Sequence, residues 1–558
     1  MKDHRLESFM QHLTHSITCI KREWQANSKR QEVPKMAKRN PEPKPAGAHE
    51  GSTSSPPLSL SLEDNVKVIR SRLGNSPDLI IREYETTDNA NQMAAVYING
   101  IIDKERVEEF ITHAFSFGIL SEEKSAELTI LDLFTYVQEK ALNIGKEKLV
   151  QDLNSLLEAL MSGDTVLLFH GLKDAISLST SGGESRAVTE AATQVAIRGS
   201  KESFTESLGT NIALVRRRIK SPDLWIETMT LGAVTKTDVT MMYIHGLAPE
   251  ETLQEFRKKL KAIHVDSILE SGYIEQMIEE NRFSPFPTMY NTERPDSVAG
   301  NLLEGRIALF VDGTPFVLIA PTTFLMFFHT VEDYYQRYDI STLIRLLRLL
   351  CLVISLFGPA VFVAALNFHQ EMIPTPLLIN LASQREGVPF PTFVEALMME
   401  VTFEIIREAG IRMPSPIGQT VSIIGGLVLG QAAVQAGIVS PAMVIVVSLT
   451  GISSFATPSF NMALSIRVLR FVIMFIAAFI GLYGIAIVSL ILVAHMCSLR
   501  SLGVPYLSPI APFAPGDQKD VILRTPLHFM KTRKRLINRN SAESGQSGQN
   551  RQGNNNEN

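Results

Sequence analysis

Apolar residues are distributed unevenly along this chain. Up to about residue 340 charged and apolar residues are mixed, whereas from about residue 341 to 499 Leu, Ile, Val, Ala, Phe and Gly dominate. An apolar run of about 20 residues is long enough to cross the roughly 30 Å hydrocarbon core of a bilayer. We therefore predict a soluble N-terminal half followed by an all-α, multi-pass membrane domain over residues 336–505.

Four long apolar runs predict membrane helices, and the pattern allows up to six. Arg348 lies near the start of the first run, and the second and third runs carry no charge. The fourth run, about 29 residues long, fits either one tilted helix or two pieces broken near Gly481 and Gly484. The four runs are 346–366, 418–439, 441–459 and 471–499.

Pairs of arginines precede the first and the last run, and they predict the orientation of the chain. By the positive-inside rule, the flanks that carry Arg345 and Arg348, and Arg467 and Arg470, are cytoplasmic. The N-terminus has no apolar segment typical of a signal peptide, so no cleaved leader is expected. Both observations place the soluble half on the cytoplasmic side.

The soluble half contains a duplication. Ser-Pro-Asp-Leu occurs at 76–79 and again at 221–224, and Tyr-Ile-Asn-Gly at 97–100 matches Tyr-Ile-His-Gly at 243–246. Several landmarks in one order at a near-constant offset indicate a repeated unit. Each copy reads as two strands, an amphipathic helix and a final strand pair across a glycine-containing turn. The predicted fold is thus two duplicated subdomains of the α+β or α/β class.

These patterns divide the chain into six parts. The N-terminal tail is rich in Pro, Lys, Glu and Ser, and the end of the chain is rich in Asn, Gln, Gly and Ser, so both are expected to be disordered. The parts are the tail (1–62), the first subdomain (63–187), a linker with a basic helix (188–220), the second subdomain (221–335), the membrane domain (336–505) and the C-terminal tail (506–558).

Two charged helices are candidates for interfaces. In the linker, Ile212, Val215 and Ile219 share one face, which turns the arginines outward; they either form a solvated, salt-bridged surface or contact another subunit or lipid headgroups. Residues 392–409 form an amphipathic helix with glutamates at i, i+4 and i+8. That helix either lies at the membrane interface or lines a wet vestibule. The charged candidates are Arg216, Arg217, Arg218, Glu400, Glu404 and Glu408.

The run that begins near residue 418 has the clearest functional pattern. On a helical wheel, Gln and Thr side chains lie within about 80° of Leu427, and Ile424 lies on the same face. The opposite face carries small residues, which allow close helix packing in lipid. Amides beside an apolar constriction are typical of a hydrophobic gate, although glutamines can also bond between helices. The pore candidates are Gln419, Thr420, Ile424, Leu427, Gln431 and Gln435.

Composition adds little chemistry. The net charge of −5 gives no basic footprint for nucleic acid, and Cys19, Cys351 and Cys497 are too far apart in sequence to indicate a disulfide framework or a zinc site. No nucleophile elbow, zinc-protease or phosphate-loop motif is present, so neither an enzyme nor a cofactor or metal is expected. A secondary transporter would want inverted repeats and ionisable residues at mid-membrane, which the clear spans lack.

Four segments of the chain occur in a specific order. They are VTEAATQVAIRGSKESFTESLGTNIALVRRR (188–218), FSPFPTMYNTERPDSVAGNLLEGRIALFVDGTPFVLIAP (283–321), PFPTFVEALMMEVTFEIIREAGIRMPSPIGQTVSIIGGLVLGQAAVQAGIVSP (389–441) and SIRVLRFVIMFIAAFIGLYGI (465–485). This ordered series resembles the A-subunit family of GerA-type spore germinant receptors, and the resemblance covers about residues 70–530. Departures are mild: the N-terminal tail is long, and Ser200 stands where the family more often has Pro.

The resemblance implies a multi-pass protein of the spore inner membrane. Its partners would be a transporter-like B subunit that senses the nutrient and a lipoprotein C subunit. Copies of the chain would form a ring, expected to be a pentamer, that releases cations when germinant binds, and Leu427 falls at the family's constriction. Related proteins of the same family that release ions without a nutrient-sensing partner are the alternative.

Overall fold

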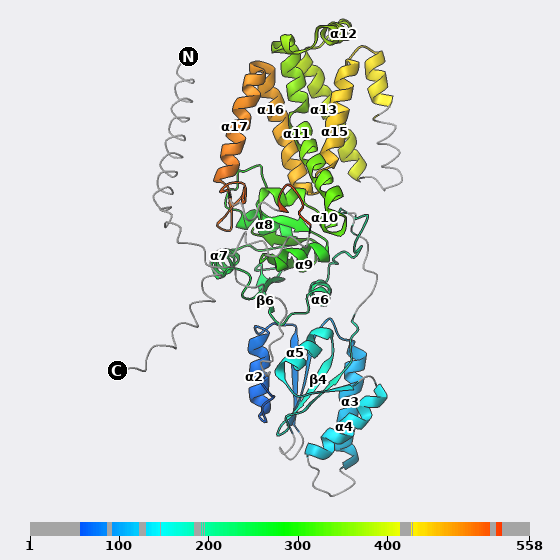
Figure 1. Ribbon diagram of the computed structural model, residues 1–558, viewed down its shortest axis with the longest axis vertical. Coiled ribbons are helices and arrows are strands. Elements are labelled where there is room, and N and C mark those ends of the chain that lie inside the picture. Colours follow the sequence, from blue (N-terminus) through cyan, green and yellow to red (C-terminus); the bar gives the residue numbers. More distant parts are fainter. Residues whose placement is uncertain are drawn as a thin grey trace, which may run out of the picture. The chain divides into compact units, whose positions relative to one another are not determined.

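Figure 1 shows the computed structural model of the chain. The structure describes residues 56–85, 92–121, 130–144, 147–183, 191, 193–194, 196–412, 426, 428–513 and 520–526, all of which belong to one compact unit, Ser55–Asn558. Most of both predicted tails, and part of the predicted pore helix, therefore lie outside the described residues. The described N-terminal half is mixed α/β with antiparallel sheets, and the rest is mainly helical.

The first five-stranded sheet has the order β1-β2-β4-β5-β3, and all its strands pair antiparallel. Leu58 and Leu62, which were expected to lie in the tail, are buried in the core of this subdomain. Its strands are β1 (Leu79–Glu85), β2 (Gln92–Ile98), β3 (Glu147–Val150), β4 (Thr165–Phe169) and β5 (Ala175–Leu178), and its helices are α2 (Leu62–Arg72), α3 (Lys104–Ser121), α4 (Ile130–Ile144) and α5 (Leu153–Ser162).

The second sheet repeats the first, in the order β6-β7-β9-β10-β8. Even the register is shared, because Leu79 pairs with Ile98 in one copy and Leu224 with Ile244 in the other. The predicted duplication agrees with this common order. The strands are β6 (Leu224–Leu231), β7 (Thr237–Ile244), β8 (Tyr290–Thr292), β9 (Ile307–Val311) and β10 (Val317–Ala320), and the helices are α6 (Leu208–Arg218), α7 (Glu250–Lys261), α8 (Ser271–Ile278) and α9 (Pro295–Leu303).

Alternation along the strands divides the second subdomain into two cores. Met241 and Tyr243 pack toward α7 and α8, whereas Met242 and Ile244 face the other side of the sheet. That second core also contains side chains from the helical half, including Met462 and Tyr506. The second subdomain and the helical half therefore share a hydrophobic core.

Among the residues that the structure describes, the helical half contains two helices long and apolar enough to cross a membrane, α11 and α16, and two shorter apolar helices, α15 and α17. Figure 1 shows α11, α13, α15, α16 and α17 side by side. The elements are η1 (Phe324–Phe328), α10 (Glu332–Tyr335), α11 (Tyr338–Phe368), η2 (Gln370–Met372), α12 (Thr375–Arg385), α13 (Thr392–Arg412), α15 (Pro441–Phe455), α16 (Phe460–Ile480), α17 (Leu482–Ser498), β11 (Arg500–Ser501) and β12 (Val504–Pro505).

The structure resolves the two readings of the last apolar run in favour of two helices. Gly481 ends α16 with φ of 69°, a conformation that glycine adopts without strain. A side chain there would also meet His369 and Phe368, since an added Cβ lies 2.9 Å and 3.0 Å from their nearest atoms. The sharp turn between α16 and α17 therefore requires glycine.

Candidate functional site

The predicted pore residues are only partly described. Gln419, Thr420, Ile424 and Leu427 lie outside the described residues. Gln431 and Gln435 lie on a helical stretch, 428–435, and both are exposed on the single chain. The structure therefore shows the position of these two glutamines without bringing the six candidates together, and the gate remains a prediction.

The three glutamates of α13 that were predicted as vestibule or interface residues occupy different environments. Glu400 is completely buried, and its carboxylate lies 3.0 Å from Arg470 Nη2. Glu404 is partly buried and pairs with Arg470 and Arg467, both at 3.2 Å. Only Glu408 is exposed, beside Arg412 on the same helix. Glu400 and Glu404 thus face other helices of the protein, and Glu400 does not face water.

These contacts give a different role to the two arginines that were predicted to flank the last span. Arg467 and Arg470 do not flank an apolar helix, since α16 begins at Phe460 and both side chains point to α13. The sequence pattern did not connect Arg470 to Glu400 or Arg467 to Glu404, which are 70 and 63 positions apart. The rule that a charge within an apolar helix needs a partner could have suggested the pairing.

A second charged cluster joins α10, α11 and the C-terminal segment. Asp333 accepts from Arg345 at 3.1 Å and from Arg348 at 2.9 Å, and Arg345 also contacts Asp520 at 2.9 Å. Burial alone would raise the pKa of Asp333, but Arg348 and Arg345 hold that pKa below its usual value. The arginines predicted to mark the cytoplasmic flank of the first span therefore bind carboxylates of this chain.

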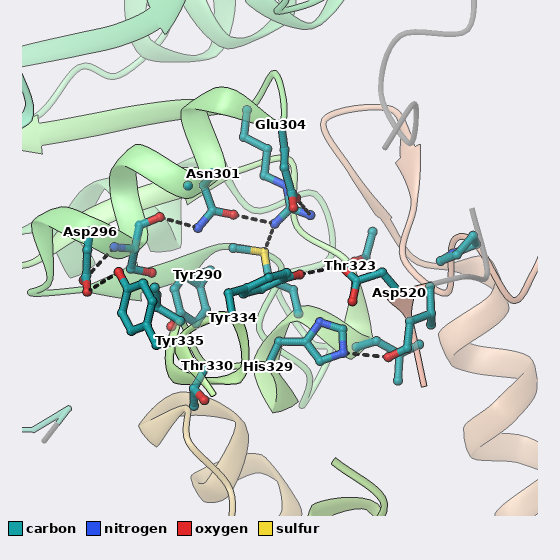
Figure 2. Close-up of a pocket in the computed structure, with 18 residues that line it drawn as sticks. Tyr290, Asp296, Asn301, Glu304, Thr323, His329, Thr330, Tyr334, Tyr335 and Asp520 are labelled. Atoms are coloured by element: carbon teal, nitrogen blue, oxygen red, sulfur yellow. Dashed lines mark hydrogen bonds and ion pairs between the residues drawn. The ribbon is translucent and has the colours of Figure 1, made fainter. Parts of the chain in front are cut away.

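A cavity of about 370 Å³ lies beside this cluster, between α9, η1, α10 and the C-terminal segment (Figure 2). Tyr335 Oη donates to Asp296 Oδ2 at 3.1 Å, and Tyr334 Oη donates to Asp520 Oδ2 at 2.6 Å. Burial and the charge of Asp296 raise the pKa of Tyr335 to about 12. These lining groups bond to one another, so the cavity is the centre of a hydrogen-bonded junction.

The prediction that the linker arginines all face outward is wrong for Arg216. Its side chain is 1% exposed, and its Nε lies 2.8 Å from Asp78 Oδ2. Its Nη1 also donates to the carbonyl oxygen of Leu224 at 2.7 Å. Helical periodicity could not reveal this contact, because Asp78 belongs to the first subdomain and Leu224 to the second. Arg216 is therefore a buried link between the two copies.

The neighbouring arginines are also engaged within the chain. Arg217 Nη2 donates to the carbonyl oxygen of Gly182 at 2.8 Å, and Arg218 pairs with Glu202. This pattern favours the salt-bridged linker over a surface that offers all three arginines to lipid or to another subunit.

A polar contact connects α8 of the second subdomain to the first turn of α16. Asn461 Nδ2 donates to Glu275 Oε1 at 3.4 Å. Burial, and then the charges of Glu279 and Glu270, raise the pKa of Glu275 to about 7. Among the residues that the structure describes, no group of three or more His, Cys, Asp or Glu could hold a metal ion.

Comparisons with known proteins agree on one family. The model of the Bacillus/Clostridium GerA spore germination protein family matches residues 67–536. Spore germination protein KA of Bacillus subtilis (strain 168) is 51% identical over 84% of this chain and 85% of its own length. Spore germination protein GerLA of Bacillus cereus is 39% identical over 85% of this chain and 96% of its own length.

Two further matches complete the comparison. The uncharacterized membrane protein YfkQ of Bacillus subtilis (strain 168) is 43% identical over 88% of this chain and 94% of its own length. The crystal structure of the N-terminal domain of the A subunit of the Bacillus megaterium spore germinant receptor GerK3 is 44% identical, with a TM-score of 0.38. It covers 49% of this chain and 98% of the crystallised one.

Proposed function

The chain belongs to the GerA spore germination protein family, and on that basis we propose that it is the membrane A subunit of a spore germinant receptor. The observation that carries this proposal is the extent of the family match, residues 67–536, which includes both sheets and the four apolar helices that the structure describes. Relatives named as spore germination proteins match over more than four-fifths of the chain. Membership of this family supports a role of the chain in spore germination.

The proposed location is the spore inner membrane, crossed several times, with the two soluble subdomains on the cytoplasmic side. The apolar helices α11, α15, α16 and α17 support this location. Many of their large apolar side chains are exposed on the single chain, which suits contact with lipid or with other membrane chains. Arg345, Arg348, Arg467 and Arg470 pair with carboxylates of this chain, so the proposed orientation does not rest on them. The shared core with α16 keeps the second subdomain next to the membrane helices.

The proposed activity is release of cations through a ring of copies of this chain, expected to be a pentamer. Gln431 and Gln435 support such a ring, since amide side chains exposed on a membrane helix need water or another chain as partner. The gate would lie at Ile424 and Leu427, where a narrow apolar neck cannot hold the hydration water of an ion. A B subunit that senses the nutrient and a lipoprotein C subunit would complete the receptor. No enzymatic reaction is proposed.

A second function within the family is an ion-release channel without a nutrient-sensing partner. This alternative is supported by the 43% identity to the membrane protein YfkQ, whose name does not mention germination. Genes for B and C subunits beside this gene would support the receptor, and their absence would support the second function. A secondary transporter is less favoured.

Deletion of the gene tests the proposal. Spores without it should lose optical-density change in response to at least one nutrient mixture, and should keep their response to a trigger that needs no receptor. Reintroducing the gene should restore the nutrient response. Wild-type responses of the deletion strain to every nutrient, in a background without other family members, would refute a receptor role.

A further inference from the structure

Helix α16 belongs to both halves of the molecule. In its first turns, Met462 and Ile466 are buried in the core of the second soluble subdomain, together with Phe286 and Tyr506. Further along the same helix, Ile473 and other side chains are buried in the separate core of the helical bundle. A displacement of the second subdomain therefore acts directly on a helix of the bundle.

The transition between these two cores carries two arginines. Arg470 is 1% exposed and reaches both Glu400 and Glu404 of α13, at 3.0 Å and 3.2 Å. Arg467 reaches Glu404 from one turn earlier, also at 3.2 Å. A charge in a dry interior is strongly unfavourable without its partner. The four side chains therefore fix one register of α13 along α16, because a shift by one helical turn would separate the buried charges.

Helix α13 is in turn fixed to α15 at both ends. The backbone N–H of Ser440, at the start of α15, donates to Glu395 Oε1 at 2.6 Å. At the other end, Arg407 Nη2 donates to Ser454 Oγ at 2.7 Å, and its guanidinium lies 4.9 Å from the centre of the Phe455 ring. An acid at the N-terminus of α15 and a base at its C-terminus both suit the helix dipole.

The spacing of these two contacts agrees with the length of α15. Residues 395 and 407 of α13 are 12 positions apart, about 18 Å along a helix, and residues 440 and 454 are separated by about 21 Å. The two helices therefore run parallel and are joined by contacts near both ends. The polypeptide that joins them, residues 413–439, includes the residues predicted to form the gate.

We propose that Arg470 and Arg467 are positioning residues of the proposed channel, which couple the second soluble subdomain to the α13–α15 pair through Glu400 and Glu404. This inference rests on the proposed function. The arginines of α16 form ion pairs with Glu400 and Glu404 of α13. This role does not require either arginine to contact the permeant ion. A conformational change in the second soluble subdomain would thus shift α16, and α16 would shift the helical bundle.

The test separates coupling from simple stability. A single Arg470→Gln change leaves Glu400 buried without its charge partner and should lower protein abundance. The double variant Glu400→Gln/Arg470→Gln removes both charges, so the protein should accumulate and assemble at wild-type levels. If the ion pairs carry the coupling, the nutrient concentration for half-maximal cation release should still shift, by roughly tenfold, a typical allosteric coupling.

The matched control is the exposed pair on the same helix. Glu408→Gln/Arg412→Gln removes an exposed ion pair within α13 and should leave the threshold unchanged. The probe is a defined mixture of amino acids and sugars applied to spores, with cation release followed by conductivity and abundance by immunoblot. A wild-type threshold in the double variant at wild-type abundance overturns the inference.

A second variant keeps the test decisive if the double variant does not accumulate. Glu404 is 24% exposed and contacts both arginines, so Glu404→Gln should be tolerated by the fold and should shift the threshold in the same way. An unchanged threshold in Glu404→Gln also overturns the inference. Failure of the proposed function looks different, because then the deletion strain itself responds normally to nutrients.

Discussion

Replacing Arg216 should destabilise the link between the two soluble subdomains more than any change at its neighbours. The side chains of Arg216 and Asp78 are 1% and 8% exposed, and the guanidinium also satisfies the Leu224 carbonyl. Arg216→Met keeps the length of the side chain but leaves a buried carboxylate without a charge partner. Breaking a buried ion pair in this way costs about 3–5 kcal/mol.

The magnitude can be read as a shift in chemical denaturation. For an m-value of about 2–3 kcal/mol per molar urea, a loss of about 3–5 kcal/mol moves the midpoint by about 1–2.5 M. Trp225 is a local reporter, since its ring stacks on His245 at 3.8 Å and its Nε1 donates to the carbonyl oxygen of Arg72. The chain has two tryptophans, so Trp24→Phe leaves Trp225 as the only one.

The assay compares variants of the purified full chain in detergent by Trp225 fluorescence. Arg217→Met is the matched control, because the Arg217 side chain is more exposed and contacts backbone carbonyls without a buried carboxylate. Its midpoint should move by no more than about 0.5 M. Asp78→Asn combined with Arg216→Met should recover part of the loss, since no unpaired charge remains. Equal midpoints for Arg216→Met and Arg217→Met would refute the reasoning.

Three further predictions concern the proposed gate at Leu427, Glu275 beside α16, and the turn at Gly481 between α16 and α17. Leu427→Ala should wet the predicted constriction, so spores should germinate early or lose dormancy. The control Leu429→Ala should act through packing and lower assembly. Leu427→Ala spores that stay dormant, with normal protein abundance and a normal response to germinant, would exclude this gate. Glu275 has a folded pKa of about 7, above the usual 4.5 of a glutamate, so its contribution to stability is present below about pH 4.5 and lost as the pH rises through 7. Glu275→Gln should therefore be more stable than the natural chain above pH 7, by at most about 3 kcal/mol, and equal to it near pH 4.5 in thermal unfolding scans; an advantage that does not depend on pH would contradict the assignment. Gly481→Ala should lower membrane abundance, because it strains a backbone at positive φ by about 1–3 kcal/mol and brings the new methyl group against Phe368 and His369 at the end of α11. Gly300→Ala, in open space, should be neutral.

The sequence predicted the architecture of the soluble half well, because that information is local or repeated. The landmarks at 76–79 and 221–224 lead into strands with the same register in both sheets. The apolar runs likewise overlap α11, α15, α16 and α17, since length and hydropathy suffice to find such helices. The start of α16 was missed, because this helix begins at Phe460 and the predicted run begins at residue 471. The choice between one and two helices at 471–499 required the backbone conformation of Gly481, which a pattern of apolar residues does not encode.

The charged residues were harder to place, because their partners are distant in the sequence. Periodicity put Arg216 on the outer face of its helix, and it is buried because Asp78 approaches from another subdomain. Glu400 was expected at the membrane interface or in a wet vestibule, and its buried side chain instead pairs with Arg470 from another helix. A single helical wheel ranks faces by hydrophobicity and cannot show which neighbour covers a polar face. The predicted gate depends on residues 419–427 and stays a prediction.

The most direct test of a nutrient-gated cation pathway is a flux measurement on spores that carry this gene as their single A-subunit gene of the family. Cation release should begin after nutrient addition, before the optical density falls. It should be absent from matched spores without the gene, although both strains should release cations after a receptor-independent trigger. Cation release with the same nutrient dependence and the same rate in spores that lack the gene would contradict the account.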